Sequence, residues 1–357
     1  MAKASENPKK STDAIGDNRV REVEALTHKV FGQKPRRVAF PGGTHRAAFI
    51  ADIGGDLFVL AKRESVEDAQ LEAIVLKCLS KTRHVPDFIA RQERWLVQQC
   101  VPGQRLPILL DEAETGAPRR ELLGDALEAL AIIHEAAHDE GLQHRVPRVG
   151  IRPGWIEDRI GEMHRTSRIL EIGEAKIDQT AIYKMLDVKH RDFIKWDARP
   201  GNALVHEGRH YWFDWEDCGR RNALDDLACL FCDEWSMITA QAEDELTERF
   251  LPRFARSMPS DRAYDYLMVA GLVQTTYRLR LAVKYHHRDN EWWSRSKCLK
   301  GDKVGVTAQE VGRLCERGIR WASRHEMLTP YIEWLQRVAD VLEVNLSADV
   351  NKHKDAA

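Results

Sequence analysis

The strongest constraint on this chain is the spacing of three polar side chains. Asp197 and Asn202 stand five residues apart in the segment Lys195-Trp-Asp-Ala-Arg-Pro-Gly-Asn202, and Asp214 follows an apolar stretch at residues 211–213. Phosphoryl transfer uses such a set, because one Asp orients the acceptor hydroxyl while an Asn and a second Asp bind Mg²⁺ on the nucleotide phosphates. The spacing therefore predicts Asp197 as the catalytic residue and Asn202 and Asp214 as metal ligands.

The residues around this set favour the same arrangement. Residues 193–196 are typical of a short strand, and residues 203–205 and 211–213 are typical of a hairpin that turns at Glu207-Gly208. Such a hairpin would return the residues before and after it to one edge. We therefore expect Asn202 and Asp214 to lie close enough for one cation to contact both.

A competing motif lies just upstream. His190-Arg-Asp192 spells the catalytic triplet of protein kinases, in which an Asn follows the Asp after four residues. If Asp192 were catalytic, that Asn would stand at position 197, which is an Asp. We therefore assign catalysis to Asp197 and interpret residues 190–192 as the polar start of a strand.

The composition excludes several classes of protein. The chain has 357 residues, of which 43% are hydrophobic, enough for a large core in two lobes or domains. A net charge of −2 gives no reason to expect binding to nucleic acid or to a membrane surface. The first residues lack the apolar segment of a signal peptide. We expect a cytoplasmic protein.

Seven cysteines in a chain of this length do not indicate a disulfide framework. Cys229 and Cys232 form a Cys-x-x-Cys pair, but no second pair or histidine cluster accompanies them. The pair lies in an apolar run that is typical of a helix. We therefore expect a structural role for both thiols.

The order of elements predicts two ordered parts between two tails. We expect a disordered tail at residues 1–17, a nucleotide-binding N-lobe at 18–101, a C-lobe with the catalytic loop and acceptor pocket at 102–345, and a flexible tail at 346–357. The turn Pro102-Gly103 marks the boundary between the lobes.

The N-lobe begins with a helix and continues with three predicted strands, at residues 37–40, 47–51 and 57–61. Gly42, Gly43 and Thr44 lie in the first turn, where the glycines would allow the backbone to approach nucleotide phosphates. The two glycines do not complete a phosphate-binding motif, so a plain hairpin turn is nearly as good an interpretation.

A charged pair is expected at the end of the third strand. Lys62 could place its ammonium group on the α- and β-phosphates. A helix at residues 66–80 follows, and its internal Glu72 is the candidate to pair with Lys62. Glu67 is the alternative, but a carboxylate in a first helical turn also simply favours the helix dipole.

The order of glycine turn, strand lysine, helix glutamate, Asp-x₄-Asn and strand-end Asp resembles the aminoglycoside phosphotransferase and choline kinase superfamily over about residues 35–235. The resemblance implies an α+β, two-lobed, protein-kinase-like fold, with a small β-rich N-lobe and a larger, mainly helical C-lobe. It also implies ATP or GTP and Mg²⁺ as cofactors. Lys195 departs from the family pattern, which usually has His at this position.

The resemblance extends to three further features. The segment Trp95-Leu-Val-Gln-Gln-Cys-Val-Pro-Gly103 resembles the family hinge, where backbone groups of Gln99 and Val101 would bind the edge of the nucleotide base. His134 resembles a helix-end histidine of the family, and Asp226 matches an aspartate that braces the catalytic loop. Both are expected to be structural.

Three functions compete on this basis. A small-molecule kinase is favoured. A protein kinase needs an activation segment, but only eleven residues separate Asp214 from Asp226 and Trp-Glu stands where Phe-Gly would be expected. A binding module without catalysis would be expected to lack at least one of four residues, and all four are present: Lys62, Asp197, Asn202 and Asp214.

Acidic and aromatic residues near the catalytic segment suggest the acceptor. A small amino-bearing alcohol or an aminoglycoside-like compound would suit the acids, and aromatic faces could hold a quaternary ammonium group. The acids of a helix start also serve the helix dipole, and tryptophans are commonly core residues. The residues concerned are Glu216, Asp217, Asp225, Asp233, Glu234, Trp235, Glu291, Trp292 and Trp293.

Overall fold

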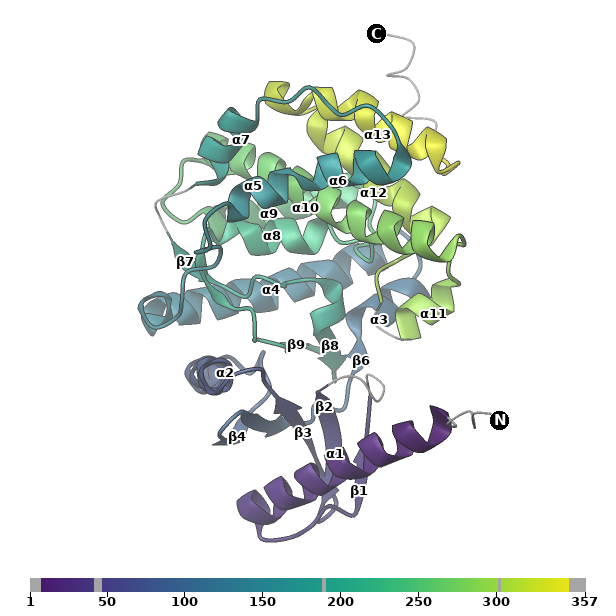
Figure 1. The fold of residues 1–357 in the computed structure, drawn as a ribbon. Coiled ribbons are helices and arrows are strands. Elements are labelled where there is room, and N and C mark those ends of the chain that lie inside the picture. The colour runs from purple at the N-terminus through teal and green to yellow at the C-terminus, as the bar shows by residue number, and fades with distance from the viewer. Residues whose placement is uncertain (1–7, 42–46, 188–190, 301–302, 347–357) are drawn as a thin grey trace, which may run out of the picture. The chain divides into compact units, whose positions relative to one another are not determined.

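The chain divides into two compact units, Met1–Pro102 and Gly103–Ala357 (Figure 1). The computed structural model describes residues 8–41, 47–187, 191–300 and 303–346. The division falls beside Pro102-Gly103, where the sequence places the turn between the lobes.

The first unit combines one sheet with two helices. Its elements are α1 Pro8–Phe31, β1 Arg37–Ala39, β2 Ala48–Ile53, β3 Asp56–Lys62, α2 Val66–Leu79, β4 Phe88–Gln92 and β5 Trp95–Gln99. The strands form an antiparallel sheet in the order β1-β2-β3-β5-β4. The predicted strands and the helix that follows them are confirmed.

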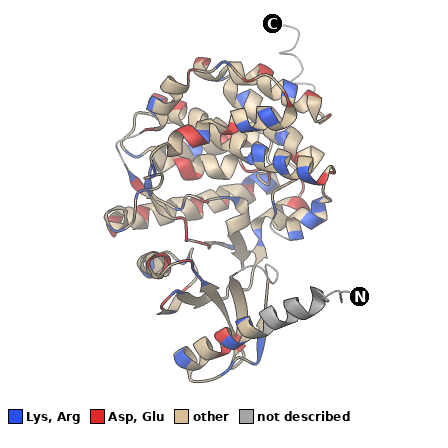
Figure 2. Ribbon diagram, in the orientation of Figure 1, with Lys and Arg blue, Asp and Glu red and all other residues tan. Residues whose placement is uncertain are grey.

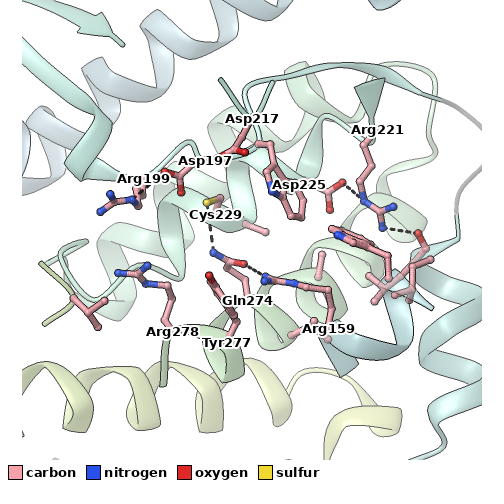
Figure 3. Close-up of a pocket in the computed structure, with 18 residues that line it drawn as sticks. Arg159, Asp197, Arg199, Asp217, Arg221, Asp225, Cys229, Gln274, Tyr277 and Arg278 are labelled. Carbon is pink, nitrogen blue, oxygen red and sulfur yellow. Dashed lines mark hydrogen bonds and ion pairs between the residues drawn. The ribbon is translucent and has the colours of Figure 1, made fainter. Parts of the chain in front are cut away.

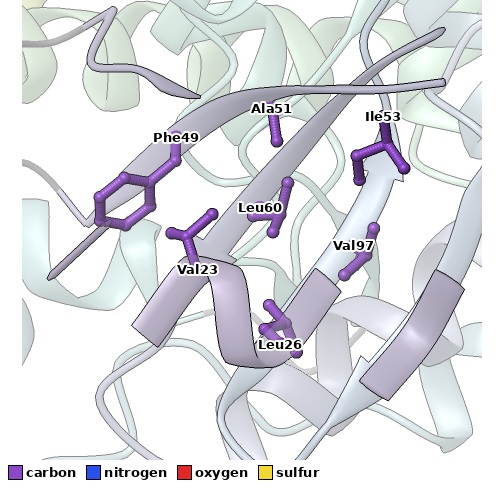
Figure 4. Packing of buried hydrophobic residues seen from close by; sticks show 7 residues of the cluster. All are labelled: Val23, Leu26, Phe49, Ala51, Ile53, Leu60 and Val97. Atoms are coloured by element: carbon purple, nitrogen blue, oxygen red, sulfur yellow. The ribbon is translucent and has the colours of Figure 1, made fainter. Parts of the chain in front are cut away.

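Helix α1 covers one face of this sheet. Val23 and Leu26 pack against Phe49, Leu60 and Val97, and all five side chains are buried (Figure 4). Phe49 faces Leu60 across the β2–β3 ladder, so side chains at alternate positions share this face. Burying a side chain of this size contributes about 1.5–3 kcal/mol, and this cluster therefore holds α1 on the sheet.

The first helix starts earlier than the sequence predicts. Residues 8–17 were expected to be disordered, whereas α1 begins at Pro8. Proline is well tolerated in a first helical turn, and each further residue added to a formed helix gains one hydrogen bond. The polar composition of this stretch therefore does not exclude a helix that continues into the packed segment. Residues 1–7 and 347–357 of the predicted tails lie outside the described residues.

Helix α2 begins at a capping box. The Ser65 side chain accepts a hydrogen bond from the Asp68 backbone N–H at 3.0 Å, and the Asp68 carboxylate accepts one from the Ser65 N–H at 3.1 Å. Two otherwise unpaired N–H groups are satisfied in this way. The cap fixes the start of the helix that carries Glu72.

The second unit is mainly helical, as the fold prediction requires. Its strands are short: β6 Gln104–Arg105, β7 Asp192–Ile194, β8 Ala203–His206, β9 Arg209–Trp212 and β10 Gly219–Arg221. Its helices are α3 Leu106–Glu112, α4 Ala117–Asp139, α5 Trp155–Ile160, α6 Glu162–Leu170, α7 Gln179–Leu186, α8 Leu224–Phe231, α9 Ala240–Ala255, α10 Ser260–Asp289, α11 Arg295–Lys300, α12 Ala308–Ala322 and α13 Pro330–Val341.

Helix α10 lies at the centre of the helical layer and packs against α6, α8 and α12 (Figure 1). Gly271 lies on α10 under the Trp321 ring of α12, and a Cβ atom there would lie 1.9 Å from that ring. Glycine is therefore required for the close approach of the two helices. This packing fixes the face of α10 that lines the site described below.

Two small sheets flank the segment that contains Asp197. Strand β7 pairs with β10, and β8 pairs with β6 and β9. The β8–β9 hairpin turns at Glu207 and Gly208, which have φ of +49° and +73°. Two successive positive φ values are typical of the tight turn that the sequence predicts, and the hairpin prediction is confirmed.

Charged residues of both signs are interspersed along the helices of the second unit (Figure 2). Within the described residues, none of the helices combines the length and the apolar character that a bilayer crossing requires.

Candidate active site

The loop after β7 brings the first two predicted residues together. A 3₁₀ turn at Pro200–Asn202 returns the chain towards Asp197. The Asn202 Nδ2 then donates to the Asp197 backbone oxygen at 3.0 Å and to Asp197 Oδ2 at 2.5 Å. The five-residue spacing read from the sequence therefore corresponds to a direct contact.

Asp214 joins this pair through the hairpin. Ala203 faces Trp212 across the β8–β9 ladder, and the Phe213 N–H donates to the Asn202 carbonyl at 3.1 Å. Asp214 is the next residue, so it leaves the hairpin at the edge where Asn202 enters it. The structure therefore places all three predicted residues at one edge of the second unit.

Lys195 supports the backbone at Asp214. Asp214 has φ of +62°, a left-handed conformation that is uncommon for residues other than glycine. The fully buried Lys195 donates from Nζ to the Asp214 carbonyl at 2.5 Å, and its ammonium lies 5.0 Å from the centroid of the Trp215 ring. Lys195 thus connects the two halves of the site from the position where the resembling family has His.

Asp226 braces the same loop. Its carboxylate accepts the backbone N–H groups of Lys195 at 2.6 Å and Trp196 at 2.7 Å, and it lies 2.8 Å from His134 Nε2. Trp196 has φ of +70°, and these bonds hold it in that conformation. The predicted structural roles of Asp226 and His134 are confirmed.

The carboxyl group of Asp197 is kept ionised. Burial acts to raise its pKa, but the charges of Arg199, Lys195 and Arg278 outweigh burial and hold the pKa below its usual value. Arg199 Nε lies 3.2 Å from Asp197 Oδ2. An ionised carboxylate is the form that can accept a proton from a hydroxyl group.

The donor set at Asn202 and Asp214 suits a hard cation. The Asn202 amide nitrogen is turned to Asp197, so its amide oxygen is directed elsewhere. Amide and carboxylate oxygens are ligands that Mg²⁺ prefers, and Mg²⁺ commonly takes one or two protein ligands together with substrate phosphates. No group of three or more His, Cys, Asp or Glu side chains that could hold an ion occurs among the described residues. Because Mg²⁺ commonly takes only one or two protein ligands beside phosphate oxygens, Asn202 and Asp214 fit a cation that also binds phosphate.

The prediction that Lys62 pairs with Glu72 is wrong. Arg63 occupies that position, because its Nε and Nη2 donate to the two Glu72 carboxylate oxygens at 2.6 and 2.9 Å. Lys62 instead pairs with Glu22 of α1 at 2.6 Å. Successive side chains of a strand point to opposite faces, so Lys62 shares the α1 face with Leu60, whereas Arg63 meets α2.

The two backbone groups predicted to contact the nucleotide base, those of Gln99 and Val101, differ in whether they already form a hydrogen bond. The Gln99 N–H donates to the Asp87 carbonyl at 2.9 Å and is therefore already used within the first unit. Val101 has no backbone hydrogen bond to another described residue, and it is 8% exposed. The Val101 backbone is thus the better candidate for a nucleotide contact.

Some predicted features lie outside the described residues. These are the glycine turn with Gly42, Gly43 and Thr44, and His190 of the competing triplet. Asp192 is described, and it begins β7 and lies 3.4 Å from Arg256.

Asp197 also forms part of the wall of a cavity of about 320 Å³ within the second unit (Figure 3). The wall is built from the catalytic loop, the segment after β9, and helices α5, α8 and α10. The side chains that line it include Trp155, Arg159, Trp196, Asp197, Arg199, Asp217, Arg221, Asp225, Cys229, Gln274, Tyr277 and Arg278.

Two of the predicted acidic residues line the cavity, Asp217 and Asp225. Asp225 pairs with Arg221 at 3.0 Å. Glu234 is fully buried behind the cavity, where Arg278 donates to both of its carboxylate oxygens at 2.8 and 2.6 Å. The acidic charges of Asp225 and Glu234 are therefore matched by arginines.

The aromatic residues of the cavity differ from those predicted. Trp155, Trp196 and Tyr277 line it. Trp292 instead stacks on His286 with ring centroids 3.8 Å apart, and Trp235 is buried. The missed residues had a helical signal, since Gln274, Tyr277 and Arg278 share one face of α10 and Trp155 and Arg159 share one face of α5.

Cys229 lies in α8 and Cys232 caps its C-terminal end. Both thiols are free and buried. Burial raises the pKa of Cys232 to about 12 and that of Cys229 well above its usual value. A protonated thiol is a poor nucleophile and a poor metal ligand.

Neither a protein-family model nor a curated protein sequence matches this chain. Among solved structures, the chain is similar to spectinomycin phosphotransferase APH(9)-Ia in complex with ADP and spectinomycin, at 13% identity and a TM-score of 0.51, over 79% of this chain and 92% of that one. It is also similar to amicoumacin kinase hAmiN in complex with AMP-PNP, Ca²⁺ and Ami, at 15% identity and a TM-score of 0.51, over 84% and 97%.

The chain has the kinase-like fold of these two solved structures. A β-rich first unit and a mainly helical second unit match this kinase-like architecture, as the sequence motifs predict. Choline kinase LicA from Streptococcus pneumoniae is a further match, at 14% identity and a TM-score of 0.47, over 85% of this chain and 100% of that one. At these identities the comparison establishes the fold, and function must be argued from the site.

Proposed function

We propose that this protein is an ATP-dependent phosphotransferase that phosphorylates a hydroxyl group of a small molecule. The observation that carries the proposal is the position of Asp197, which lines a cavity and is hydrogen-bonded to Asn202 beside Asp214. The cavity is the acceptor site, and the edge formed by Asn202 and Asp214 is the phosphate site. One side chain, Asp197, belongs to both.

The chain's own residues would act chiefly by positioning and by charge. The Asp197 carboxylate would orient the acceptor hydroxyl and accept its proton as the oxygen attacks the γ-phosphorus of ATP, while the bond to the bridging oxygen breaks and ADP leaves. Asn202 and Asp214 would hold Mg²⁺, which supplies neutralisation of phosphate charge. Lys195 and Asp226 keep the loop fixed, so that little reorganisation accompanies the reaction.

In the first unit, Arg63 takes the phosphate-binding role predicted for Lys62. Its guanidinium is held by the fully buried Glu72 through two hydrogen bonds. A planar guanidinium binds phosphate oxygens in a fixed geometry, and it stays charged when buried. Lys62 lies on the α1 face with Glu22 and has a structural role there.

The nucleotide base would bind the backbone at Val101. Backbone contacts of this kind distinguish poorly between ATP and GTP, so either nucleotide is accommodated by the proposal. Both nucleotides and Mg²⁺ are available in the cytoplasm, where we place the protein.

A small acceptor is favoured over a peptide by the course of the chain after Asp214. Strand β10 begins at Gly219 and pairs with β7, and α8 begins at Leu224. The residues that would form the activation segment of a protein kinase are therefore used to build the sheet and helix behind the cavity. The same residues supply Asp217 and Arg221 to its wall.

A cationic amino alcohol is the second candidate for the acceptor. Asp217 lines the cavity and could bind an ammonium group, and Trp155, Trp196 and Tyr277 offer aromatic faces. This candidate carries forward the acceptor class that the acidic residues of the sequence suggested.

The test is phosphoryl transfer by the purified full chain. The protein is incubated with Mg²⁺ and ATP, or GTP, and a panel of hydroxyl compounds that includes amino alcohols, aminoglycosides, sugars and hydroxy acids. Phosphorylated products are detected by mass spectrometry, with casein as a protein control and an Asp197→Asn variant as the inactive control. Labelling of casein alone would show a protein kinase. Nucleotide binding without any phosphoryl transfer would show a binding module.

A further inference from the structure

Arg159 is the unusual member of the cavity wall. Its Nη2 donates to Gln274 Oε1, and its guanidinium lies 4.1 Å from the Tyr277 ring centroid and 5.7 Å from that of Trp196. Figure 3 shows Arg159 across the cavity from Asp197 and Arg199, with Gln274 between Arg159 and Cys229. Among the described residues, Arg159 has no carboxylate partner.

The other three arginines of the wall do have carboxylate partners. Arg199 lies 3.2 Å from Asp197, Arg221 lies 3.0 Å from Asp225, and Arg278 lies 2.6 Å from Glu234. Their positive charges are therefore already compensated. Arg159 is therefore the arginine of the cavity wall that forms no ion pair with a carboxylate in the described part of the chain.

The charges of Glu162 and Asp225 act on Arg159 without forming an ion pair with it, and they compensate its charge only in part. Burial lowers the pKa of Arg159. Burial acts in the same direction on Arg278, but the charges of Glu234 and Asp233 outweigh it and raise the pKa of Arg278. An arginine side chain nevertheless stays protonated in proteins. Arg159 is partly buried, and a cation withdrawn from water without an adjacent counter-ion is destabilising, a cost that an anionic ligand would reduce.

Gln274 fixes the direction in which Arg159 points. The Gln274 Nε2 donates to the Cys229 Sγ at 3.5 Å, so its amide oxygen is turned to Arg159. An amide oxygen orients a guanidinium without neutralising it. The Arg159 charge is thus held in place and left for another group.

The geometry points to an acceptor that carries an oxyanion, a carboxylate or a phosphate ester, bound by Arg159 while its hydroxyl lies at Asp197. This assignment rests on the proposed phosphotransferase function. The cavity of about 320 Å³ is at the lower end of the usual range for ligand sites, about 300–1,000 Å³. It therefore suits a small hydroxy acid or sugar phosphate better than a compound of several rings.

The test uses four compounds that differ in one group: glycerate, glycerol phosphate, glycerol and aminopropanediol. Their binding to the full chain is measured by calorimetry without nucleotide, and their phosphorylation is measured separately with Mg²⁺ and ATP. We expect glycerate or glycerol phosphate to bind about tenfold or more tightly than glycerol, because an added charge-assisted hydrogen bond has about that effect. The comparison of these two also identifies which oxyanion is preferred.

Two variants test the role of Arg159. In Arg159→Met the preference for the anionic compounds should disappear, whereas Arg159→Lys should keep part of it. Gln274→Glu leaves the arginine in place but gives it an internal carboxylate, so it should also remove the preference and need not harm folding. The matched control is Arg152→Gln, since the Arg152 side chain is 62% exposed and pairs with Asp158 outside the cavity wall.

The outcomes separate the two proposals. Equal or tighter binding of glycerol or aminopropanediol by the unmodified protein would overturn the oxyanion assignment, as would an unchanged anion preference in both Arg159→Met and Gln274→Glu. Anion binding that depends on Arg159 without any phosphoryl transfer would overturn the proposed function and leave the oxyanion site standing.

Discussion

The contrast between Arg63 and Lys62 yields the sharpest prediction for the first unit. The Arg63 and Glu72 side chains are only 11% and 0% exposed, and two hydrogen bonds join them. The Lys62 and Glu22 side chains are 29% and 40% exposed, and a single contact joins them. The two cations are adjacent in sequence, so substituting each by Met compares a buried with a solvated ion pair in one strand.

The expected magnitudes differ widely. Arg63→Met leaves the buried Glu72 carboxylate without its partner, and breaking a buried pair in this way costs about 3–5 kcal/mol. Lys62→Met removes a partly exposed pair, which costs at most about 1 kcal/mol. Hydrogen exchange of peptides from β3 and α2 measures the free energy of opening of this unit directly. We expect exchange to accelerate by about a hundredfold or more in Arg63→Met and by less than about tenfold in Lys62→Met.

A double variant separates stability from nucleotide binding. In Arg63→Met with Glu72→Met, two apolar side chains replace the buried pair, and such replacements are often neutral or stabilising. We expect the slow exchange of β3 and α2 to return while the affinity for Mg²⁺–ATP stays low, because the guanidinium that binds phosphate is missing. Normal nucleotide affinity in the double variant would refute the phosphate role of Arg63. Equal destabilisation by Arg63→Met and Lys62→Met would refute the reasoning from burial.

Three further predictions concern the second unit. Asp197→Asn should lower kcat by about a hundredfold or more, whereas Asp192→Ala should affect mainly stability. An inactive, well-folded Asp192→Ala protein beside an active Asp197→Asn protein would reverse the assignment. Asp214→Asn should weaken Mg²⁺-dependent nucleotide binding in a Mg²⁺ titration and leave the circular dichroism spectrum unchanged, and an unaltered Mg²⁺ dependence would exclude Asp214 as a ligand. Burial acts to raise the pKa of Asp197, but the charges of Arg199 and Lys195 outweigh burial, so the folded pKa lies below the unfolded value of 3.8. The stability that the ionised carboxylate contributes is therefore present above pH 3.8 and is lost as the pH falls through the folded pKa. Activity should therefore show no Asp197-dependent loss between neutral pH and about pH 4 in a pH–rate profile. An acidic limb above that value that moves to still higher pH in Arg199→Gln would contradict the assigned ionisation.

The sequence by itself determined the features that depend on short separations along the chain. Asp197, Asn202 and Asp214 lie within one loop and one hairpin, so their spacing and the Glu207-Gly208 turn were enough to predict that they meet. The helix that carries Glu72 was predictable for the same reason, since its apolar period and its start lie within a few residues of each other. The fold class followed from the order of these local units.

The tertiary structure alone decided which side chains face one another across elements. Lys62 and Arg63 are adjacent, and the choice between them depends on which face of the sheet meets α2 and which meets α1, a packing that the strand does not encode. The cavity beside Asp197 is built from helices that include α5, α8 and α10. These helices are separate in the sequence, so Arg159 and Gln274 meet only when the helices pack together. Local periodicity could indicate that each of these residues shares a helix face, but the charge balance of the cavity arises from the packing of distant segments.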